Sequence, residues 1–266
     1  MNRIRIKFGF GMAVLAAAML TGCASGPSGG SQQELATSSD QTDIQKRASI
    51  RLQLAVGYYE QRQWKVALDE IKQALAADPN YADAYGVRAL IYMEMAENRL
   101  AEDNFLQALK LSPNNSDFSN NYGWFLCQNG READAIAYFD AALANGAYQA
   151  PVKALNNAGV CSVKMKRNGD ALQYFSRAFQ LDSAHPLTNT YLAKIYLERD
   201  DQERSRFYLN RLGKADFISA DVLWVAIKVA RKLGDRESEM GLASQLQRRH
   251  ANSSEYSAYQ REAFDD

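Results

Sequence analysis

Residues 67–79 read ALDEIKQALAADP, and residues 101–113 read AEDNFLQALKLSP, 34 positions further along the chain. The same pattern begins again at Ala135, after a second step of 34 residues. Each copy has a small residue, a bulky residue four positions later and a small residue three positions after that. The first two copies close with Pro79 and Pro113. A period of this length indicates a chain built from stacked helical units, with each proline at the end of a helix.

The pattern continues along the chain with some drift. Later copies carry Ala171, Phe175 and Ala178, then Ser205, Leu209 and Leu212, and more weakly Ser238, Leu242 and Gln245. The units begin near Ala48, Ala82, Ser116, Val152, Pro186 and Ser219. A 34-residue unit with these offsets is typical of the tetratricopeptide repeat, a helix–turn–helix that buries its apolar face only by stacking. We therefore predict an all-α fold, a right-handed superhelical solenoid of about six tetratricopeptide repeats.

Two details refine this prediction. The starts are separated by 34, 34, 36, 34 and 33 residues, so a short insertion, residues 144–151, lies between the third and fourth units. Gly130 fits the turn between the two helices of the third unit. An ordinary helical bundle with accidental alanine spacing is the alternative, but it would not explain the matched aromatics and prolines.

The first residues have the pattern of a secretory signal. Arg3, Arg5 and Lys7 precede an apolar stretch, residues 8–20, which is too short to span a bilayer comfortably. It leads into Leu20-Thr21-Gly22-Cys23, which resembles the bacterial lipobox, in which the signal is cut before a cysteine that is then lipidated. The alternative is an ordinary cleaved signal with an incidental cysteine.

These patterns divide the chain into three parts. We expect residues 1–22 to form a lipoprotein signal peptide and residues 23–42 to form the lipidated Cys23 and a flexible tether. Residues 43–260 then form the tetratricopeptide-repeat solenoid. Ala24 follows the cysteine, where an aspartate would favour retention in the inner membrane by the best-known sorting scheme. By that resemblance we expect a lipid-anchored protein of the outer membrane that faces the periplasm.

Composition limits what else the chain contains. Six repeats use nearly all of the 244 residues from Cys23 onward, which leaves no room for a second catalytic domain. The 31 basic and 31 acidic residues give a formal net charge of zero, whereas a nucleic-acid-binding protein usually presents a basic face. We therefore expect no nucleic-acid partner.

Residue types that carry chemistry are sparse. Neither His185 nor His250 lies in a metal-ligand or nucleophile–base arrangement, so a capping or surface role is expected for both. No glycine-rich phosphate loop is present. Cys127 and Cys161 lie on adjacent first helices, one assigned to the concave side and the other to the packing seam, and we expect reduced thiols rather than a bridge. The chain is thus predicted to be no enzyme, with no cofactor and no metal.

The inner surface of the solenoid is the candidate binding site. In this repeat class, first-helix positions 2, 5, 9 and 12 face inward, and in the sixth unit they select Leu223 and Ile227. The stripe is apolar with a few amides, which suits an amphipathic helix or an extended segment of a protein partner. The alternative is that Trp124 and Leu90 belong to the core. The predicted partner-binding residues are Tyr59, Leu90, Met93, Asn120, Trp124, Asn156 and Val160.

A related binding mode fits less well. Some repeat proteins of this class hold a C-terminal carboxylate with a clamp of Lys, Asn and Arg side chains. Asn121 and Lys153 occupy two matching positions, but Gly86, Leu90 and Asn157 replace the other members. We do not predict that mode.

Several stretches, in this order, resemble one family. They are Asn120-Asn121-Tyr122-Gly123-Trp124-Phe125-Leu126, Leu155-Asn156-Asn157-Ala158-Gly159 after the insertion, Ile227-Lys228-Val229-Ala230 leading to Gly234-Asp235-Arg236, and the closing Ser254-Glu255-Tyr256. Together with the lipobox they are similar to the type IV pilus biogenesis lipoproteins called PilW or PilF, over roughly residues 1 to 260. Trp124 departs from some relatives of this family, in which a small residue is expected at this position.

The resemblance implies a function. It implies a non-enzymatic outer-membrane pilotin, monomeric by itself, that binds the pilus secretin through the concave groove and promotes its outer-membrane localisation and multimerisation. Pilus extension and twitching motility would depend on it. A second interpretation remains open, because repeat lipoproteins of similar size also act as scaffolds for cell-wall hydrolases or outer-membrane assembly machinery. The third interpretation is an enzyme. It would require a measured catalytic turnover that is lost when His185 or a groove carboxylate is replaced.

Overall fold

The computed structural model describes residues 42–212 and 219–264, and this part of the chain contains α-helices and no strands. The predicted signal peptide, Cys23 and almost all of the tether lie outside the described residues. No helix within the described part is both long enough and apolar enough to cross a membrane. The helices are α1 (Asp43–Glu60), α2 (Trp64–Ala77), α3 (Ala82–Glu94), α4 (Asn98–Leu111), α5 (Ser116–Gln128), α6 (Glu132–Ala144), α7 (Pro151–Lys164), α8 (Asn168–Leu181), α9 (Pro186–Glu198), α10 (Gln202–Leu209), α11 (Ala220–Lys232), α12 (Arg236–His250) and α13 (Ser254–Gln260).

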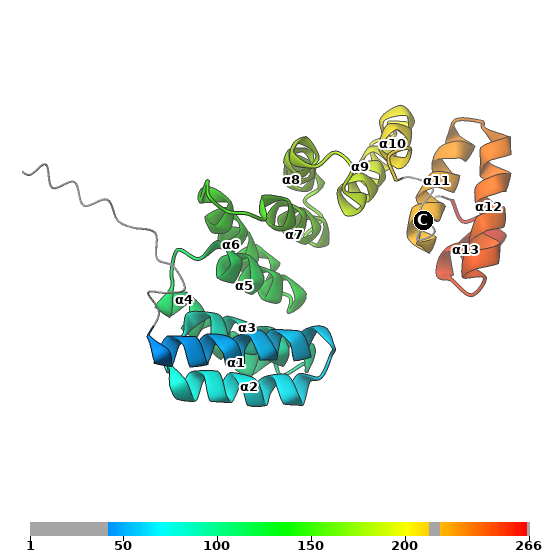
Figure 1. The fold of residues 1–266 in the computed structure, drawn as a ribbon. Helices are drawn as coiled ribbons and strands as arrows, with labels where there is room; N and C mark the ends of the chain where they lie inside the picture. Colours follow the sequence, from blue (N-terminus) through cyan, green and yellow to red (C-terminus); the bar gives the residue numbers. More distant parts are fainter. Residues whose placement is uncertain (1–41, 213–218, 265–266) are drawn as a thin grey trace, which may run out of the picture. The chain divides into compact units, whose positions relative to one another are not determined.

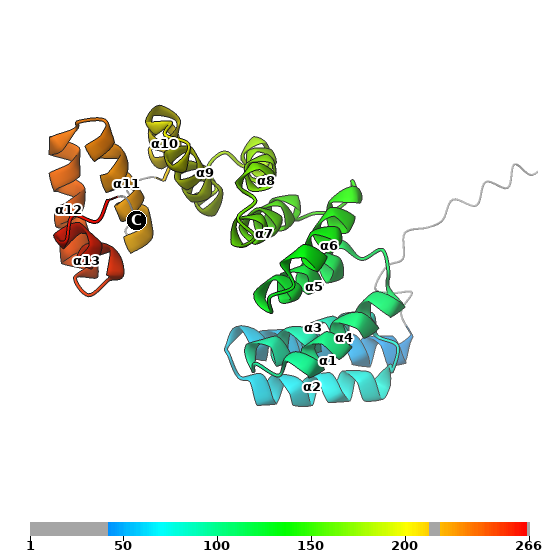
Figure 2. The same ribbon diagram turned by 180° about the vertical axis from the view of Figure 1, so that it is seen from behind.

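The helices pack as consecutive pairs. Each odd-numbered helix from α1 to α11 packs against the even-numbered helix that follows it, and each pair contacts the next pair (Figures 1 and 2). The short α13 packs on both helices of the last pair. Six stacked helix–turn–helix units confirm the predicted all-α superhelical repeat fold.

The repeated small–bulky–small pattern forms the core between the paired helices. In the first four repeats all three of its positions are fully buried: Ala67, Ile71 and Ala74, Ala101, Phe105 and Ala108, Ala135, Phe139 and Ala142, and Ala171, Phe175 and Ala178. An aromatic ring can lie there only where the facing helix carries no bulk. A Cβ placed on Gly123 would lie 2.9 Å from the ring of Phe139, and one on Gly159 would lie 2.6 Å from the ring of Phe175. Gly123 and Gly159 are therefore packing requirements of the third and fourth repeats.

The turn inside each repeat has the same backbone form. One residue in every turn has a positive φ, and these residues are Arg62, Ala96, Gly130, Lys166, Asp200 and Gly234. A left-handed residue after a helix lets the chain reverse and satisfies the last carbonyl groups of that helix. Glycine is the residue that adopts this conformation without steric cost, and it occupies two of the six positions. The prediction that Gly130 forms the turn of the third repeat is confirmed.

The last two repeats depart from this pattern. Ser205 replaces the first alanine of the motif; it is fully buried and its hydroxyl donates a 2.8 Å hydrogen bond to the carbonyl oxygen of Ala193. The sixth repeat has Ser238 at the corresponding position, and this residue is exposed. Its core is instead a cluster of Leu223, Ile227 and Leu246 on α11 and α12, against which Tyr256 of α13 packs.

Candidate partner-binding groove

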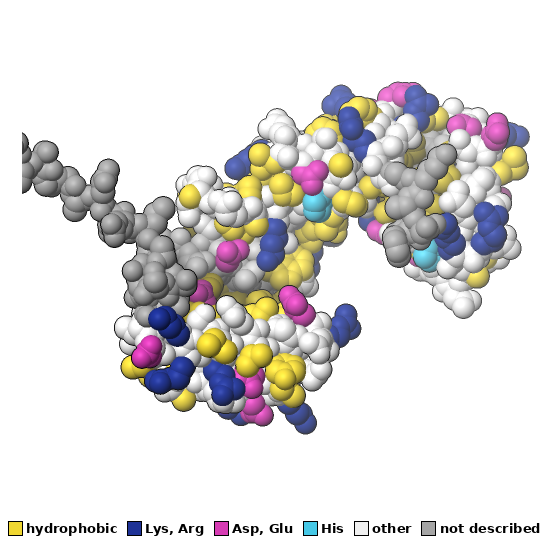
Figure 3. Space-filling model, in the orientation of Figure 1, with side chains coloured by type: hydrophobic (Ala, Val, Ile, Leu, Met, Phe, Trp, Pro, Cys, Tyr) yellow, Lys and Arg dark blue, Asp and Glu magenta, His cyan; other side chains and the backbone are white. Residues whose placement is uncertain are grey.

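Five of the predicted binding residues are half-buried on the first helices of four consecutive repeats. They are Tyr59 on α1, Leu90 and Met93 on α3, Trp124 on α5 and Val160 on α7. Leu90, Met93 and Trp124 pack against the core cluster of the second and third repeats while keeping part of their surface exposed. They are thus anchored in the core and still accessible to a partner. Figure 3 shows hydrophobic side chains gathered over the region where α5, α7 and α9 follow one another.

The ring of Tyr59 illustrates this intermediate environment. Its centroid lies 5.2 Å from that of Trp64, at the start of α2. Burial, together with the nearby carboxylate of Glu94, raises the pKa of the Tyr59 hydroxyl. The hydroxyl therefore stays protonated at neutral pH and can act as a hydrogen-bond donor.

The other two predicted residues, Asn120 and Asn156, are buried and bonded between repeats. Asn157 donates a 3.0 Å hydrogen bond from its amide to Oδ1 of Asn120. Asn156 accepts a 2.8 Å hydrogen bond from the hydroxyl of Thr188 on α9. These amides link α5 to α7 and α7 to α9, because a buried amide must be hydrogen-bonded. Their observed contacts are structural, and partner binding by all seven residues stays a prediction.

The two matching members of the carboxylate clamp contact each other. Lys153 donates from Nζ to Oδ1 of Asn121, at 3.2 Å, across α5 and α7. A carboxylate in this place would have to compete with the Asn121 oxygen for the lysine.

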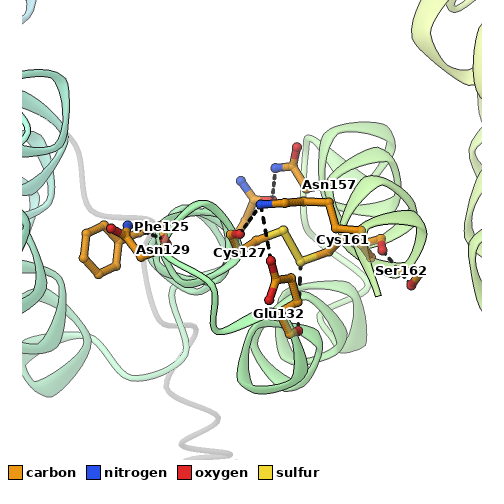
Figure 4. The surroundings of a disulfide bond; sticks show 10 residues. Phe125, Cys127, Asn129, Glu132, Asn157, Cys161 and Ser162 are labelled. Atoms are coloured by element: carbon orange, nitrogen blue, oxygen red, sulfur yellow. Dashed lines mark hydrogen bonds and ion pairs between the residues drawn. A yellow bond between two sulfur atoms is a disulfide. The ribbon is translucent and has the colours of Figure 1, made fainter. Parts of the chain in front are cut away.

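The expectation of reduced thiols is wrong, because Cys127 and Cys161 form a disulfide (Figure 4). Their Cα atoms lie 5.9 Å apart, within the range that a disulfide needs. The assignment by repeat position placed the two residues on different sides of their helices. That assignment did not consider how closely the first helices of adjacent repeats pack. In the structure α7 lies against α5, which brings the two cysteines together.

A lysine reinforces the same junction between the third and fourth repeats. Lys164 donates from Nζ to the carbonyl oxygen of Cys127, at 2.6 Å, and lies 3.4 Å from a carboxylate oxygen of Glu132. This cation also neutralises the partial negative charge at the carboxyl end of α5. The disulfide, the amides and this lysine together hold α5 and α7 in a fixed relation under the predicted groove.

The inward positions predicted for the sixth repeat are wrong by one residue. Leu223 and Ile227, predicted to face the groove, are almost completely buried in the core formed with α12 and α13. The residues that face α9 are instead Trp224 and Lys228, one position further along. The change follows from α13, an element that the repeat pattern does not contain and that adds a second apolar surface for α11 to cover.

A hollow of about 560 Å³ lies between α9 and α11, and we call it the α9–α11 hollow. An ion pair of 2.6 Å joins Lys194 of α9 to Asp221 of α11 at its edge. Burial alone would raise the pKa of Asp221, but hydrogen bonds from Lys194 and Ser219 outweigh it and lower that pKa. The residues that line the hollow are Lys194, Leu197, Glu198, Asp221, Trp224, Val225, Lys228, Lys232 and Phe264. Trp224 was missed by the sequence analysis, although its large ring on a first helix could have drawn attention to it.

Two features bear on chemistry, a histidine and the possible metal ligands. His185 caps the amino end of α9, where its ring accepts a hydrogen bond from the backbone N–H of Thr188, so the predicted capping role of His185 is confirmed. Residues 42–212 and 219–264 contain no cluster of His, Cys, Asp or Glu side chains suited to a metal ion. The geometry supports recognition of a protein segment over apolar surface.

Comparison with known proteins gives relatives for nearly the whole chain. Residues 52–94 and 87–150 match the family model of the tetratricopeptide repeat. The type IV pilus assembly protein PilF of Pseudomonas aeruginosa strain PAO1 is 27% identical over 248 residues, which cover 93% of this chain and 96% of PilF.

Two solved structures show the same architecture. The crystal structure of PilW, described as a widely conserved type IV pilus biogenesis factor, is 31% identical, with a TM-score of 0.73, and the match covers 82% of this chain and 99% of PilW. The structure of Pseudomonas aeruginosa PilF is 25% identical, with a TM-score of 0.79, over 83% of this chain and all of that chain. The resemblance drawn from the sequence is confirmed, and the chain belongs to the PilW and PilF family of tetratricopeptide-repeat proteins of type IV pilus biogenesis.

Proposed function

We propose that this protein is a pilotin of type IV pilus biogenesis. It binds the pilus secretin in the periplasm and promotes the localisation of that secretin to the outer membrane and its assembly into multimers. The observation that carries this proposal is the similarity to PilF and PilW, which extends over nearly the full length of both relatives. Tetratricopeptide repeats bind protein segments on their inner surface, which makes a non-enzymatic adaptor the natural role.

In the proposed mechanism, a lipid on Cys23 holds the protein at the inner leaflet of the outer membrane. A single acyl chain binds membranes only marginally, so stable anchoring requires the several chains of a bacterial lipoprotein. A tether of about twenty residues reaches on the order of 25 Å as a flexible chain. The solenoid then samples a thin layer next to the membrane, which raises the local concentration of any secretin that it holds there.

The half-buried stripe of Tyr59, Leu90, Met93, Trp124 and Val160 supplies the proposed contact surface. An apolar strip with rings anchored in the core suits the apolar face of a secretin segment. The disulfide between α5 and α7 lies in the same first helices as Trp124 and Val160. It keeps these parts of the surface in one arrangement before the partner arrives, which lowers the entropy cost of binding.

The first test removes the gene and follows the secretin. Inner and outer membranes are separated, and the secretin is detected by immunoblot in samples that have not been heated. Loss of the heat-stable multimer, or its retention in the inner membrane, is the expected result. A Cys23→Ser variant should bind the secretin but fail to restore multimers in the outer membrane, because it lacks the lipid.

The deletion strain can also give the result that contradicts the proposal. Normal multimers in the outer membrane of the deletion strain would refute the pilotin function. A scaffold for cell-wall hydrolases or outer-membrane assembly machinery would then be the better interpretation, and co-purification with those enzymes would replace secretin assembly as the assay.

A further inference from the structure

The α9–α11 hollow contains a contact made by the chain's own C-terminal segment. The ring of Phe264 stacks on that of Trp224, with the two centroids 5.1 Å apart, and forms one wall of the hollow. The guanidinium of Arg231 lies 3.7 Å from the centroid of the Phe264 ring. The hollow therefore already accepts one aromatic side chain, held by stacking and by a cation–π contact.

The backbone directs Phe264 to this place. After α13 the chain turns at Glu262, whose φ is +54°. The backbone N–H of Ala263 then donates to the carbonyl oxygen of Ala258, at 3.0 Å, and the N–H of Phe264 to that of Glu262, at 3.0 Å. This turn and its hydrogen bonds bring the ring of Phe264 against α11.

The charge of the lining favours carboxylates next to the aromatic side chain. The hollow is lined by three lysines, Lys194, Lys228 and Lys232, and by the carboxylates of Glu198 and Asp221. Lys194 is paired with Asp221 at 2.6 Å and Lys232 with Asp200 at 2.7 Å, so a carboxylate of a ligand would share these cations with their present partners. The sequence continues from Phe264 with Asp265 and Asp266, which lie outside the described residues. An aromatic side chain followed by acidic residues thus matches both the ring of Trp224 and the lysines of the lining.

The size of the hollow leaves room for more than the chain's own phenylalanine. With Phe264 as one wall, about 560 Å³ remains open, which lies within the usual range of about 300–1,000 Å³ for a binding pocket. Leu197 and Val225 add apolar lining beside the lysines. This volume and mixture of surface fit a short peptide segment.

We propose that the α9–α11 hollow is a second recognition site, which binds a peptide segment of a protein partner with an aromatic side chain followed by carboxylates. The aromatic side chain of the segment takes the place of Phe264 on Trp224, and the rest of the segment occupies the open volume, so the chain's own Phe264 competes with it. The site lies on the last two repeats, apart from the stripe that ends at Val160. This inference goes beyond the proposed secretin binding. Its test uses a synthetic peptide and the purified chain alone, so its outcome is independent of the pilotin function.

The probe is a fluorescent peptide copying residues 256–266, YSAYQREAFDD, added to the purified full chain. Fluorescence anisotropy is measured for the wild-type protein and for Phe264→Ala, which removes the competing ring. A segment held in the same molecule has an effective concentration near the millimolar range, so its removal should strengthen binding of the peptide at least tenfold. Equal affinity for the two proteins, or no binding to Phe264→Ala at millimolar peptide, would overturn the proposal.

Changes in the peptide test the chemistry without altering the protein. Replacing its phenylalanine by alanine should abolish saturable binding to the Phe264→Ala protein. Replacing both aspartates by asparagine should weaken binding several-fold and reduce its dependence on salt. A peptide without the phenylalanine that binds equally well would show that the stacking contact is not what the site recognises.

A pair of protein variants places the peptide in the hollow. Leu197→Arg, made together with Phe264→Ala, puts a long side chain into the lining and should abolish binding. Leu181→Arg in the same background is the control, because Leu181 is 59% exposed on α8 and does not line the hollow. Thermal unfolding of both variants confirms that they are folded. Equal loss of binding in the two variants would refute the location.

Discussion

The third and fourth repeats and the last two repeats are held together in different ways. In the former, Phe139 and Phe175 are completely buried against glycine-bearing helices, and a disulfide joins α5 to α7. In the latter, α10 is an eight-residue helix, and surface ion pairs such as Lys194–Asp221 connect α9 to α11. Buried aromatic rings contribute several kcal/mol each, whereas exposed ion pairs contribute at most about 1 kcal/mol. The buried small–bulky–small motif thus stabilises each repeat that carries it. A repeat without the motif needs other contacts, such as those that α13 makes with the last pair of helices.

The largest effect that this comparison predicts is the loss of a buried ring. Phe139→Ala should lower the free energy of unfolding by about 3–5 kcal/mol, because Gly123 cannot fill the space left beside it. Urea denaturation followed by circular dichroism measures the change. Phe207→Ala in α10 is the control, since Phe207 is 47% exposed, and it should cost less than about 1 kcal/mol. Similar losses in the two variants would contradict the contrast between the regions.

Removing the disulfide should have the next largest effect. The bond closes a loop with a sequence separation of 34 residues, for which chain entropy gives a stabilisation of about 3–4 kcal/mol. A reductant should therefore lower the midpoint of thermal unfolding of the wild-type protein. The double variant Cys127→Ala, Cys161→Ala should unfold at that lower temperature with or without reductant. A wild-type midpoint that does not respond to complete reduction would show that the bond adds no stability.

The 34-residue period of the sequence predicts which motif residues are buried and where the turns and the insertion lie. Burial of Ala67, Phe105 and Phe139 follows directly from their spacing, because every repeat must cover the same face of its neighbour. The turn at Gly130 follows from the same period. The insertion before Pro151 also appears where the spacing changes from 34 to 36, between the end of α6 and the start of α7.

The sequence does not predict contacts that depend on how closely two repeats approach. Cys127 and Cys161 occupy different positions in their repeats, so the pattern assigns them to different surfaces, yet their helices bring them together. The burial of Leu223 in place of Trp224 depends on α13, which has no counterpart in the repeat. The inter-repeat bonds of Asn120 and Asn156 also escape the pattern, because an amide serves equally in a groove and in a buried hydrogen bond.

Replacing an anchored ring of the stripe should reduce binding more than stability. Trp124→Ala should weaken binding to the purified periplasmic part of the secretin about tenfold or more, since half-buried tryptophans often dominate interfaces. Biolayer interferometry measures the affinity. Leu106→Ala, at an exposed position on the second helix of its repeat, should leave binding unchanged. If Leu106→Ala weakened binding as much as Trp124→Ala, the contact surface would have to be placed on the second helices instead.

The smallest effect concerns the ion pair of the last two repeats. The pKa of Asp221 is lowered in the folded protein, so its contribution to stability is present above the carboxyl pKa of the unfolded chain and is lost as the pH falls through the folded value. Asp221→Asn should therefore lower the thermal midpoint slightly at pH 7, by an amount that corresponds to less than about 1 kcal/mol for a partly exposed pair. Below the lowered pKa of Asp221 in the folded protein both proteins carry a neutral side chain at this position, and their midpoints should converge. A difference that persisted in acid would mean that Asp221 acts through its shape or its hydrogen bonds and not through its charge.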